Sequence, residues 1–294
     1  MIKTAGMVAL KGGIFQMGSN HHYPEEAPAH MAEVRPFAID EATVTNAEFR
    51  RFVLDTGYVS DAEKAIPQCE APDLPPEARE PGGLVFTMTD HPVPLGDFRQ
   101  WWRFVPGACW YQPEGPGSDL LGRLDHPVVQ VSLNDAMAYA AWAGKALPTE
   151  KEWEFAARDG VSTEYPWGDQ LMPNGRRMAN IWHGEFPHKN RKKGRFLSCA
   201  SRQGQRSRFG LYNMIGNVWE WTVTPYRNGH SRAQSGACCT PSRTVLPGQS
   251  YVTKGGSFLC APSYCRRYRA AARSPQEVRS TTNHLGFRCV LRPT

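Results

Sequence analysis

Glycine and proline interrupt this chain so often that no long helix or strand can form. The 294 residues include 27 Gly and 24 Pro. Glycine permits turns with positive φ, and proline favours turns by fixing φ near about −65°. The stretch 65–121 is rich in both and has little periodicity, but Trp101, Trp102 and Trp110 lie within it and argue against disorder. The sequence therefore predicts an ordered, loop-rich fold anchored by aromatic side chains.

Three segments carry signals strong enough to place helices. Each begins with a Ser or Thr that is followed three residues later by Glu or Asp, the spacing at which side chain and backbone cap each other. Apolar residues at helical spacing come next, and a glycine ends each segment. Helices are predicted over residues 45–57, 132–144 and 149–160.

The remaining regular structure is predicted to be short strands. Residues 12–18, 33–40 and 125–131 fit strands, because their apolar residues lie between Gly and Pro signals. Beyond Tyr165 the helix signals disappear, and short apolar pieces alternate with turns up to Thr294. Since no linker divides the chain, we expect one compact α+β domain over residues 1–294 with little regular secondary structure.

Composition excludes several classes of protein. No run approaches the roughly 20 apolar residues that a membrane-spanning helix needs, and residues 1–10 lack the apolar core of a signal peptide. Eight Cys are too few for a disulfide scaffold in a chain of this length. We therefore expect a cytoplasmic protein, a monomer, that does not bind membranes.

A basic segment covers residues 188–208. It carries eight Lys and Arg and no acid, against a net charge of +6 for the whole chain. Such a cluster can bind nucleic acid or acidic peptides, but no nucleic-acid recognition motif accompanies it. We interpret the segment as a solvated loop and expect no nucleic-acid partner.

The chemically most suggestive stretch contains two cysteines, Cys260 and Cys265, directly behind the pair Gly255-Gly256. Lys254 and the arginines that follow Cys265 surround them with positive charge. Nearby cations stabilise thiolate over thiol, and thiolate is the form that attacks sulfur or binds a soft metal. Spacing alone leaves a redox or metal site, a structural disulfide and two unrelated core cysteines all open.

A second stretch offers oxygen ligands. The segment Asn213-Met-Ile-Gly216-Asn-Val218-Trp-Glu220 places an amide, backbone carbonyls and a carboxylate around a glycine turn. Hard cations such as Ca2+ are bound by oxygen sets of this kind. The alternative is a turn in which Asn213 and Glu220 only bond backbone groups.

Several motifs together resemble the formylglycine-generating enzymes, also called sulfatase-modifying factors. The resemblance implies a single loop-rich domain related to C-type lectins. It extends from Gly12 to Cys289 and rests on these motifs: Gly13-Ile-Phe-Gln-Met-Gly18, Val44-Thr-Asn-Ala-Glu-Phe49, Leu147-Pro-Thr-Glu-Lys-Glu-Trp153, Gly216-Asn-Val-Trp-Glu-Trp221, Gly286-Phe-Arg-Cys289 and, closer to the oxidases among the family, Gly107-Ala-Cys-Trp110, Ala179-Asn-Ile-Trp-His-Gly-Glu-Phe186 and Gly255-Gly-Ser-Phe-Leu-Cys260.

The resemblance implies an oxidase that converts a cysteine in an unfolded Cys-x-Pro-x-Arg segment of a sulfatase to Cα-formylglycine, with O2, a thiol reductant and Cu(I). Thiolates do select Cu(I) among available metals. Matched residue by residue, the resemblance implies copper ligands at Cys260 and Cys265 and a catalytic role for Ser257. It implies substrate-binding roles for Trp219, Arg273 and His284, the last at a family asparagine.

The resemblance also implies calcium sites. The first would use Asn213, Gly216, Val218 and Glu220. The second would use Asn180, Ile181 and Phe196, but Gly194 stands where the family has an aspartate, so we expect that site to lose most of its affinity. A Lys or Arg of the basic segment is an alternative occupant that could reach the same oxygen acceptors.

Disulfides of the family are not expected here. Ala157 and Ala270 stand at positions where the resemblance implies cysteine partners, and such bridges cannot form. Their absence agrees with a reducing compartment. Two further functions remain open on the same fold: an oxidase acting on a peptide other than a sulfatase, and a non-catalytic peptide-binding protein.

Overall fold

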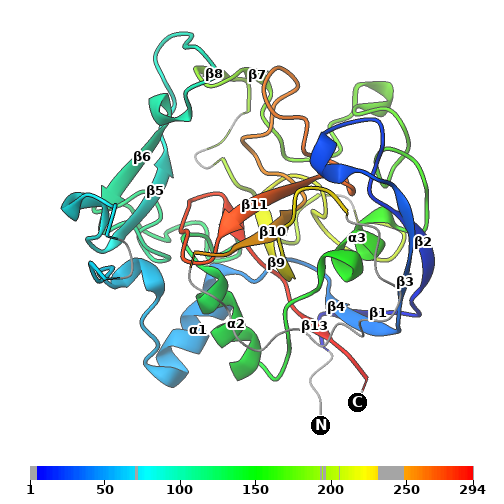
Figure 1. The fold of residues 1–294 in the computed structure, drawn as a ribbon, viewed down its shortest axis with the longest axis horizontal. Coiled ribbons are helices and arrows are strands. Elements are labelled where there is room, and N and C mark those ends of the chain that lie inside the picture. The colour runs from blue at the N-terminus through cyan, green and yellow to red at the C-terminus, as the bar shows by residue number, and fades with distance from the viewer. Residues whose placement is uncertain are drawn as a thin grey trace.

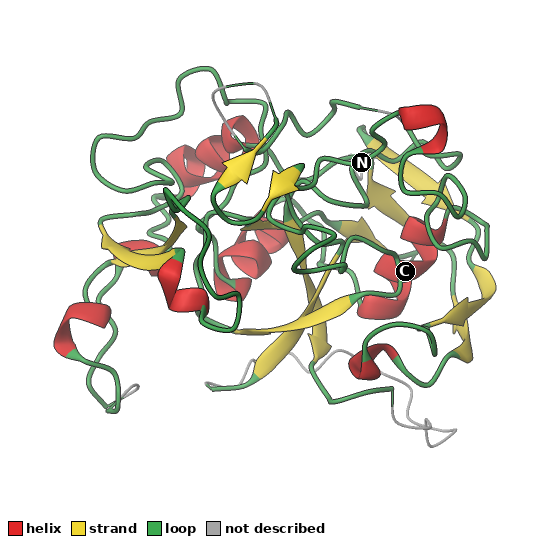
Figure 2. Cartoon of the chain, turned by 90° about the horizontal axis from the view of Figure 1, so that it is seen from above, coloured by secondary structure: helices red, strands yellow, loops and turns green. Residues whose placement is uncertain are grey.

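The computed structural model describes residues 5–69, 72–192, 194, 197–204, 206–230 and 248–293. Loops make up most of the chain, as Figure 2 shows. All three predicted helices are confirmed, each with the reciprocal side-chain and backbone cap at its start. They are α1 Asn46–Thr56, α2 Leu133–Trp142 and α3 Glu150–Arg158.

The strands form small sheets around a central sheet of four strands (Figure 1). Its order is β11-β10-β9-β12, in which only β9 and β12 run parallel. A second sheet has the order β1-β4-β13, and β2-β3, β5-β6 and β7-β8 are two-stranded. The strands are β1 Met7–Leu10, β2 Gly13–Met17, β3 His30–Val34, β4 Phe37–Asp40, β5 Gly82–Phe86, β6 Trp102–Pro106, β7 Gly184–Glu185, β8 Lys189–Asn190, β9 Trp219–Pro225, β10 Ser250–Lys254, β11 Arg273–Glu277, β12 Leu285–Gly286 and β13 Val290–Leu291.

The strand predictions succeed in part. The strand predicted over 12–18 is confirmed as β2, and the one over 33–40 splits into β3 and β4 beside Pro36, which has no N–H to donate. The strand over 125–131 is wrong. There the N–H of Val128 bonds the Val44 carbonyl, that of Gln130 bonds Thr282, and Gln130 has a positive φ of 57° that ends any extended run.

In the described part of the stretch 65–121, aromatic residues pack into the core, as predicted, and Trp101 is fully buried. It also contains the antiparallel pair β5-β6, which the sequence did not reveal. The apolar residues of β5 follow two glycines without alternation, so no strand period was visible. This hairpin carries Trp102 and Phe86 to the side of the molecule on which the cysteines lie.

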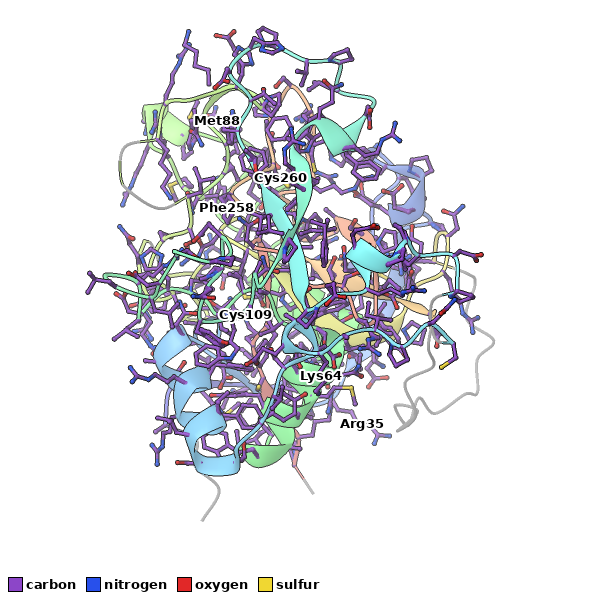
Figure 3. The ribbon with its side chains drawn as sticks, turned by 90° about the vertical axis from the view of Figure 1, so that its left-hand side faces the viewer. Arg35, Lys64, Met88, Cys109, Phe258 and Cys260 are labelled. Carbon is purple, nitrogen blue, oxygen red and sulfur yellow. The ribbon has the colours of Figure 1, made fainter. Side chains whose placement is uncertain are left out.

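The segment that carries the cysteines lies between two hydrophobic clusters. One joins α1 and α2 to the central sheet and includes Cys260. The other gathers Phe86, Trp182, Phe258 and their neighbours. Figure 3 looks onto the side of the molecule that carries β5 and β6, with Phe258 and Cys260 labelled. Because residues 258–261 contribute to both clusters, core packing fixes the loop in place.

The observed architecture agrees with the predicted class, a mixed α+β fold of short elements with extensive loops. Among the described residues, no helix is long and apolar enough to cross a membrane.

Candidate active site

Two consecutive turns bring Cys260 and Cys265 together. The N–H of Cys260 donates to the Ser257 carbonyl at 3.0 Å, and the N–H of Cys265 donates to the Ala261 carbonyl at 2.8 Å. The second turn contains five residues, 261–265, and the Sγ atoms of Cys260 and Cys265 lie 3.3 Å apart. Both thiols are free, with Cys260 buried and Cys265 half-buried. The five-residue spacing therefore creates a two-sulfur site and not two separate core cysteines.

The glycine pair closes the base of the cysteine loop, which we define as residues 255–268. Gly255 and Gly256 have positive φ of 93° and 72°. A Cβ at Gly256 would lie 2.7 Å from the Arg267 carbonyl oxygen, and one at Gly255 would lie 3.0 Å from the Met214 carbonyl oxygen. Glycine is required at both positions, because it permits this backbone and leaves room for the neighbouring chain.

Three residues implied by the resemblance form a chain of contacts that begins at Cys260. The N–H of Ser257 donates to Cys260 Sγ at 3.4 Å, and Ser257 Oγ lies 3.0 Å from His284 Nδ1. The N–H of Trp219 in β9 donates to the His284 carbonyl at 2.8 Å, across the parallel pairing with β12. Trp219 is buried in the same cluster as Cys260. The central sheet thus assembles these residues from three separate segments.

Burial keeps His284 uncharged. Desolvation lowers the pKa of its imidazole to about 3, so it is neutral at physiological pH. The N–H of Leu259 donates to Ser257 Oγ at 3.2 Å, which leaves the hydroxyl hydrogen of Ser257 for another acceptor. A Ser257 hydroxyl that donates to Nδ1 would leave the His284 hydrogen on Nε2. The pair can orient a polar group of a substrate or a water by hydrogen bonding.

Aromatic side chains surround the loop. Tyr264, between the two cysteines, stacks on Phe186 with ring centroids 4.6 Å apart and meets the edge of Trp101 at 5.4 Å. Trp102 of β6 packs edge-on against His284 at 4.8 Å. The N–H of Trp182 donates to the Cys260 carbonyl at 3.0 Å. These contacts place the oxidase-like motif over residues 179–186 directly against the cysteine loop.

The two sulfurs have opposite electrostatic surroundings. Burial raises the pKa of Cys260 well above its ordinary value. The hydrogen bond from the Cys260 thiol lowers the pKa of Cys265, and the backbone N–H and guanidinium of Arg267 lower it further, against the effect of burial. The pair therefore gives up its first proton at Cys265, and the resulting thiolate is stabilised by the remaining thiol.

The positive surround predicted from the sequence is mostly neutralised. Lys254 is fully buried, and its Nζ lies 2.9 Å from Glu154 and 3.5 Å from Glu150. Arg269 forms a buried bidentate pair with Glu26 at 2.7 and 2.6 Å. Among the cations next to the cysteines, Arg267 is the one whose charge lowers the pKa of Cys265.

The prediction that Arg273 binds substrate beside the cysteines is not supported by its contacts. Its guanidinium is buried and pairs with Glu150, with Nη2 2.9 Å from Oε2 and Nε 2.9 Å from Oε1. Its Nη1 donates to the backbone carbonyls of Glu25 and Arg227. Through these partners Arg273 joins α3, β11 and the N-terminal region, and its substrate-binding role stays a prediction.

The first predicted calcium set has a competing cation. Both oxygens of Glu220 accept from Arg288, at 2.7 and 2.8 Å, and Oε2 also accepts from Trp153 Nε1 at 2.8 Å. A carboxylate can accept about four hydrogen bonds, two at each oxygen. Three are used here, so one acceptor position remains, on Oε1. The Asn213 amide donates to backbone carbonyls of the turn 200–203. The set fits calcium only if the ion shares Glu220 with Arg288.

A lysine ammonium lies beside the second predicted calcium set. Phe196 lies outside the described residues, and Ile181 is buried in the core. The Asn180 amide donates to the Leu197 carbonyl at 3.0 Å, so this carbonyl oxygen is less available to a metal ion. The ammonium of Lys192 also donates to the Leu197 carbonyl, and to that of Ser198 at 3.0 Å. A lysine of the basic segment thus occupies acceptors beside Asn180, as the alternative anticipated.

The rest of the basic segment is partly paired. Arg202 and Arg206 both bond the Glu41 carboxylate at 2.8 Å, and Lys189 pairs with Glu185 at 3.4 Å. These three cations are 46–60% exposed, so this part of the segment is solvated, as predicted, although Glu41 from a distant part of the chain pairs with two of its arginines.

The remaining cysteines form no site that the sequence suggested. Cys109 and Cys289 are buried free thiols, Cys199 is half-buried and Cys69 is exposed. Cys238 and Cys239 lie outside the described residues. Ala157 and Ala270 share one hydrophobic cluster, where apolar packing stands in place of a bridge.

Sequence reasoning missed the N-terminal contribution to this site. Glu25 pairs with Arg267 at 2.6 Å, and Tyr23 Oη accepts from the N–H of Arg266 at 3.1 Å. The acidic pair Glu25-Glu26 is complementary in charge to the arginines of the run 266–269. This complementarity was the signal in the sequence that could have predicted the contact. About 240 residues separate the two, so no local pattern connects them.

The fold and site together define a class: a loop-rich protein with a two-thiol site held between a small sheet and an aromatic surround. The sulfatase-modifying factor enzyme 1-like domain matches residues 2–293. The formylglycine-generating enzyme of Mycobacterium tuberculosis is 49% identical over 98% of this chain and 98% of its own length. The chain therefore belongs to the formylglycine-generating enzyme family.

Two other likenesses extend this comparison. A mouse relative named inactive C-alpha-formylglycine-generating enzyme 2 is 38% identical over 96% of this chain and 84% of its own length. The solved structure of PvdO from Pseudomonas aeruginosa superimposes with a TM-score of 0.65 over 98% of this chain and 94% of that one, at 22% identity. The structural likeness supports the fold alone.

Proposed function

We propose that this protein is a Cu(I)-dependent oxidase that converts a cysteine in an unfolded Cys-x-Pro-x-Arg segment of a sulfatase to Cα-formylglycine. The observation that carries the proposal is the 3.3 Å separation of the free thiols Cys260 and Cys265, whose loop packs against the motif over residues 179–186. Family membership supplies the reaction class.

The donor set fits Cu(I). Two sulfurs at this separation, with the pKa of Cys265 lowered, provide soft anionic ligands. Within the described residues, no cluster of three or more His, Cys, Asp or Glu could hold a metal ion instead. When bound by Cys260 and Cys265, copper would bring the substrate thiolate and O2 together and supply the oxidation chemistry.

The protein's own groups bind and orient the substrate. Tyr264 and Trp102 present aromatic surfaces next to the sulfurs, which suit an unfolded peptide. The Ser257–His284 pair offers a neutral hydrogen-bonding group on the Cys260 side. Arg267 stabilises negative charge on the Cys265 side. Loss of two hydrogens from the substrate side chain and hydrolysis would release sulfide, and the reductant would supply the two further electrons that O2 requires.

The decisive experiment incubates the Cu(I)-loaded protein with a Cys-x-Pro-x-Arg peptide under air and follows the peptide by mass spectrometry. We expect the aldehyde from the parent and from Cys69→Ser, a control at an exposed cysteine. Cys260→Ser and Cys265→Ser should form none. An unaltered peptide with the parent would favour a non-catalytic peptide-binding protein, and turnover of unrelated cysteine peptides would favour a non-sulfatase substrate.

We also propose one calcium ion per chain, at Asn213, Gly216, Val218 and Glu220. The oxygen set and the acceptor position left on Glu220 support this, whereas Lys192 supplies the positive charge beside Asn180. Calorimetric titration of chelator-treated protein should give one site. Replacing Lys192 by Gln and Gly194 by Asp in one variant should add a second site. Two sites in the parent would contradict the assignment to Lys192.

A further inference from the structure

The N-terminal turn Pro24–Glu26 contacts the segment that follows Cys265 through every one of its polar side chains. Glu26 is fully buried against Arg269, and its carbonyl accepts from the N–H of Ser19 at 3.0 Å. Just before the turn, Tyr23 Oη accepts from the N–H of Arg266. The turn and the segment 266–269 therefore form one rigid unit.

Arg267 is held on two sides within this unit. Its Nη2 and Nε both donate to Glu25 Oε1, at 2.6 and 3.2 Å. The centre of its guanidinium lies 3.9 Å from the centroid of the Tyr23 ring. An unrestrained arginine samples many rotamers, whereas an ion pair combined with stacking selects one. The Glu25 side chain is 13% exposed and that of Arg267 is 28% exposed, so both remain partly accessible.

Arg267 differs from the other cations near the cysteine loop because its partner, Glu25, holds it beside Cys265. Lys254, Arg269 and Arg273 pair with carboxylates that are buried in the core, and these pairs stabilise the fold. The carboxylate of Glu25 instead fixes the position of a guanidinium two residues beyond Cys265, and the charge of that guanidinium acts on the Cys265 sulfur. A cation fixed in advance stabilises developing negative charge without the cost of reorganisation.

We propose that Tyr23 and Glu25 are positioning residues that hold the Arg267 guanidinium against Cys265. The inference rests on the proposed function, because it gives that sulfur the role of a metal ligand. In that role the two thiolates carry more negative charge than one Cu(I) neutralises, and the substrate thiolate adds another. Arg267 compensates this charge, and the turn keeps it in place.

Two measurements test the proposal, and they separate it from the proposed copper chemistry. The first is Cu(I) affinity at fixed pH, by competition with a coloured Cu(I) chelator. The second uses metal-free protein equilibrated with reduced and oxidised glutathione, in which Cys260 and Cys265 are oxidised to a disulfide while glutathione disulfide is reduced to two thiols. A cation held at Cys265 favours the reduced form, because it stabilises thiolate.

Tyr23→Leu leaves the net charge unchanged and removes the stacking surface. We expect it to weaken Cu(I) binding by about tenfold and to favour the disulfide severalfold, in the same direction as Arg267→Met. Tyr23→Phe keeps the ring and should change the Cu(I) affinity and the disulfide equilibrium less than Tyr23→Leu does. With two variants of Tyr23, a folding defect in one of them does not decide the result. Melting temperatures report folding in parallel.

Glu25→Gln separates positioning from simple electrostatics. If Glu25 acted only through its charge, removing it would favour thiolate and strengthen Cu(I) binding. Because it positions Arg267, we expect the variant to weaken binding, and Glu25→Asp to recover part of the loss. Glu41→Gln, which breaks ion pairs with Arg202 and Arg206 elsewhere, is the matched control and should behave as the parent.

The proposal is overturned if Tyr23→Leu and Glu25→Gln match the parent in both measurements, or if Glu25→Gln strengthens Cu(I) binding. A parent protein that binds no Cu(I) would reject the copper centre, and the glutathione equilibrium alone would then decide the role of Tyr23 and Glu25.

Discussion

The two sulfurs of the site lie 3.3 Å apart but face different regions of the molecule. Cys260 faces the core, where its carbonyl accepts from Trp182 and its sulfur from the N–H of Ser257, and burial raises its pKa. Cys265 faces the N-terminal side, half-buried and close to Arg267, with a lowered pKa. Two identical residues of one loop therefore differ in chemistry because different parts of the chain surround them.

The largest expected effect follows from treating both sulfurs as metal ligands. Cys260→Ser and Cys265→Ser should each lower the rate of aldehyde formation by more than about 100-fold, because a hydroxyl is a poor ligand for Cu(I). Mass spectrometry of the peptide product measures the rate. A serine variant that retains parental turnover would show that its sulfur is not a ligand, and the comparison between the two would then be one of structure only.

Lys254 supports the fold, since it pairs with buried carboxylates and not with Cys260 or Cys265. Lys254→Met should remove one of the two cations that pair with Glu150 and with Glu154, leaving Arg273 and Arg158, and lower the free energy of unfolding by about 3 kcal/mol. Urea denaturation measures this. Lys151→Met, at an exposed position of α3, is the control and should change stability by less than about 0.5 kcal/mol.

The different pKa directions should appear directly in thiol reactivity. In metal-free, reduced protein at pH 7, iodoacetamide should modify Cys265 about tenfold faster than Cys260, since thiolate reacts and Cys265 is more exposed. Peptide mapping by mass spectrometry distinguishes the two sites. Arg267→Met should reduce the preference. Faster modification of Cys260 would reverse the assignment of the first proton.

The core side of the pair should also show the smallest effect, in acid stability. The folded pKa of His284 is depressed to about 3, below the unfolded value, so its contribution to stability is complete above about pH 6.5 and is lost as pH falls toward 3. His284→Asn removes that share. The full pKa shift corresponds to about 3 kcal/mol between pH 7 and pH 4, and because His284 is only half-buried, the stability of the variant should fall by about 1–2 kcal/mol less than that of the parent. Urea titrations at both pH values test this, and equal losses would mean that His284 is solvated.

The sequence predicts local structure here better than it predicts assembly. The three helices follow from caps and stops within each segment. The failed strand over 125–131 and the unseen β5-β6 hairpin depended on partners elsewhere, such as Thr282 and Val44. Hydrogen bonds to distant backbone groups leave no periodic trace.

The same limit applies to the site. Motifs of the family mark Ser257 and His284, which the structure brings into contact. A motif also marks Arg273 but does not say that its guanidinium pairs with Glu150. The sequence predicted that some Lys or Arg could replace the second calcium ion, because position 194 lacks the family aspartate. It did not show that this residue is Lys192. Physical complementarity, such as acids at 25–26 with arginines at 266–269, becomes informative only once the fold brings them together.

The pairing of Glu26 with Arg269 has a consequence for how the protein is made. The two residues are 243 positions apart. At roughly 5–20 residues per second, a ribosome needs on the order of 10–50 s to synthesise the chain between them. During that time the turn emerges without its partner, so its carboxylates stay hydrated. The contacts around Cys265 can therefore form only after nearly the whole chain has been translated.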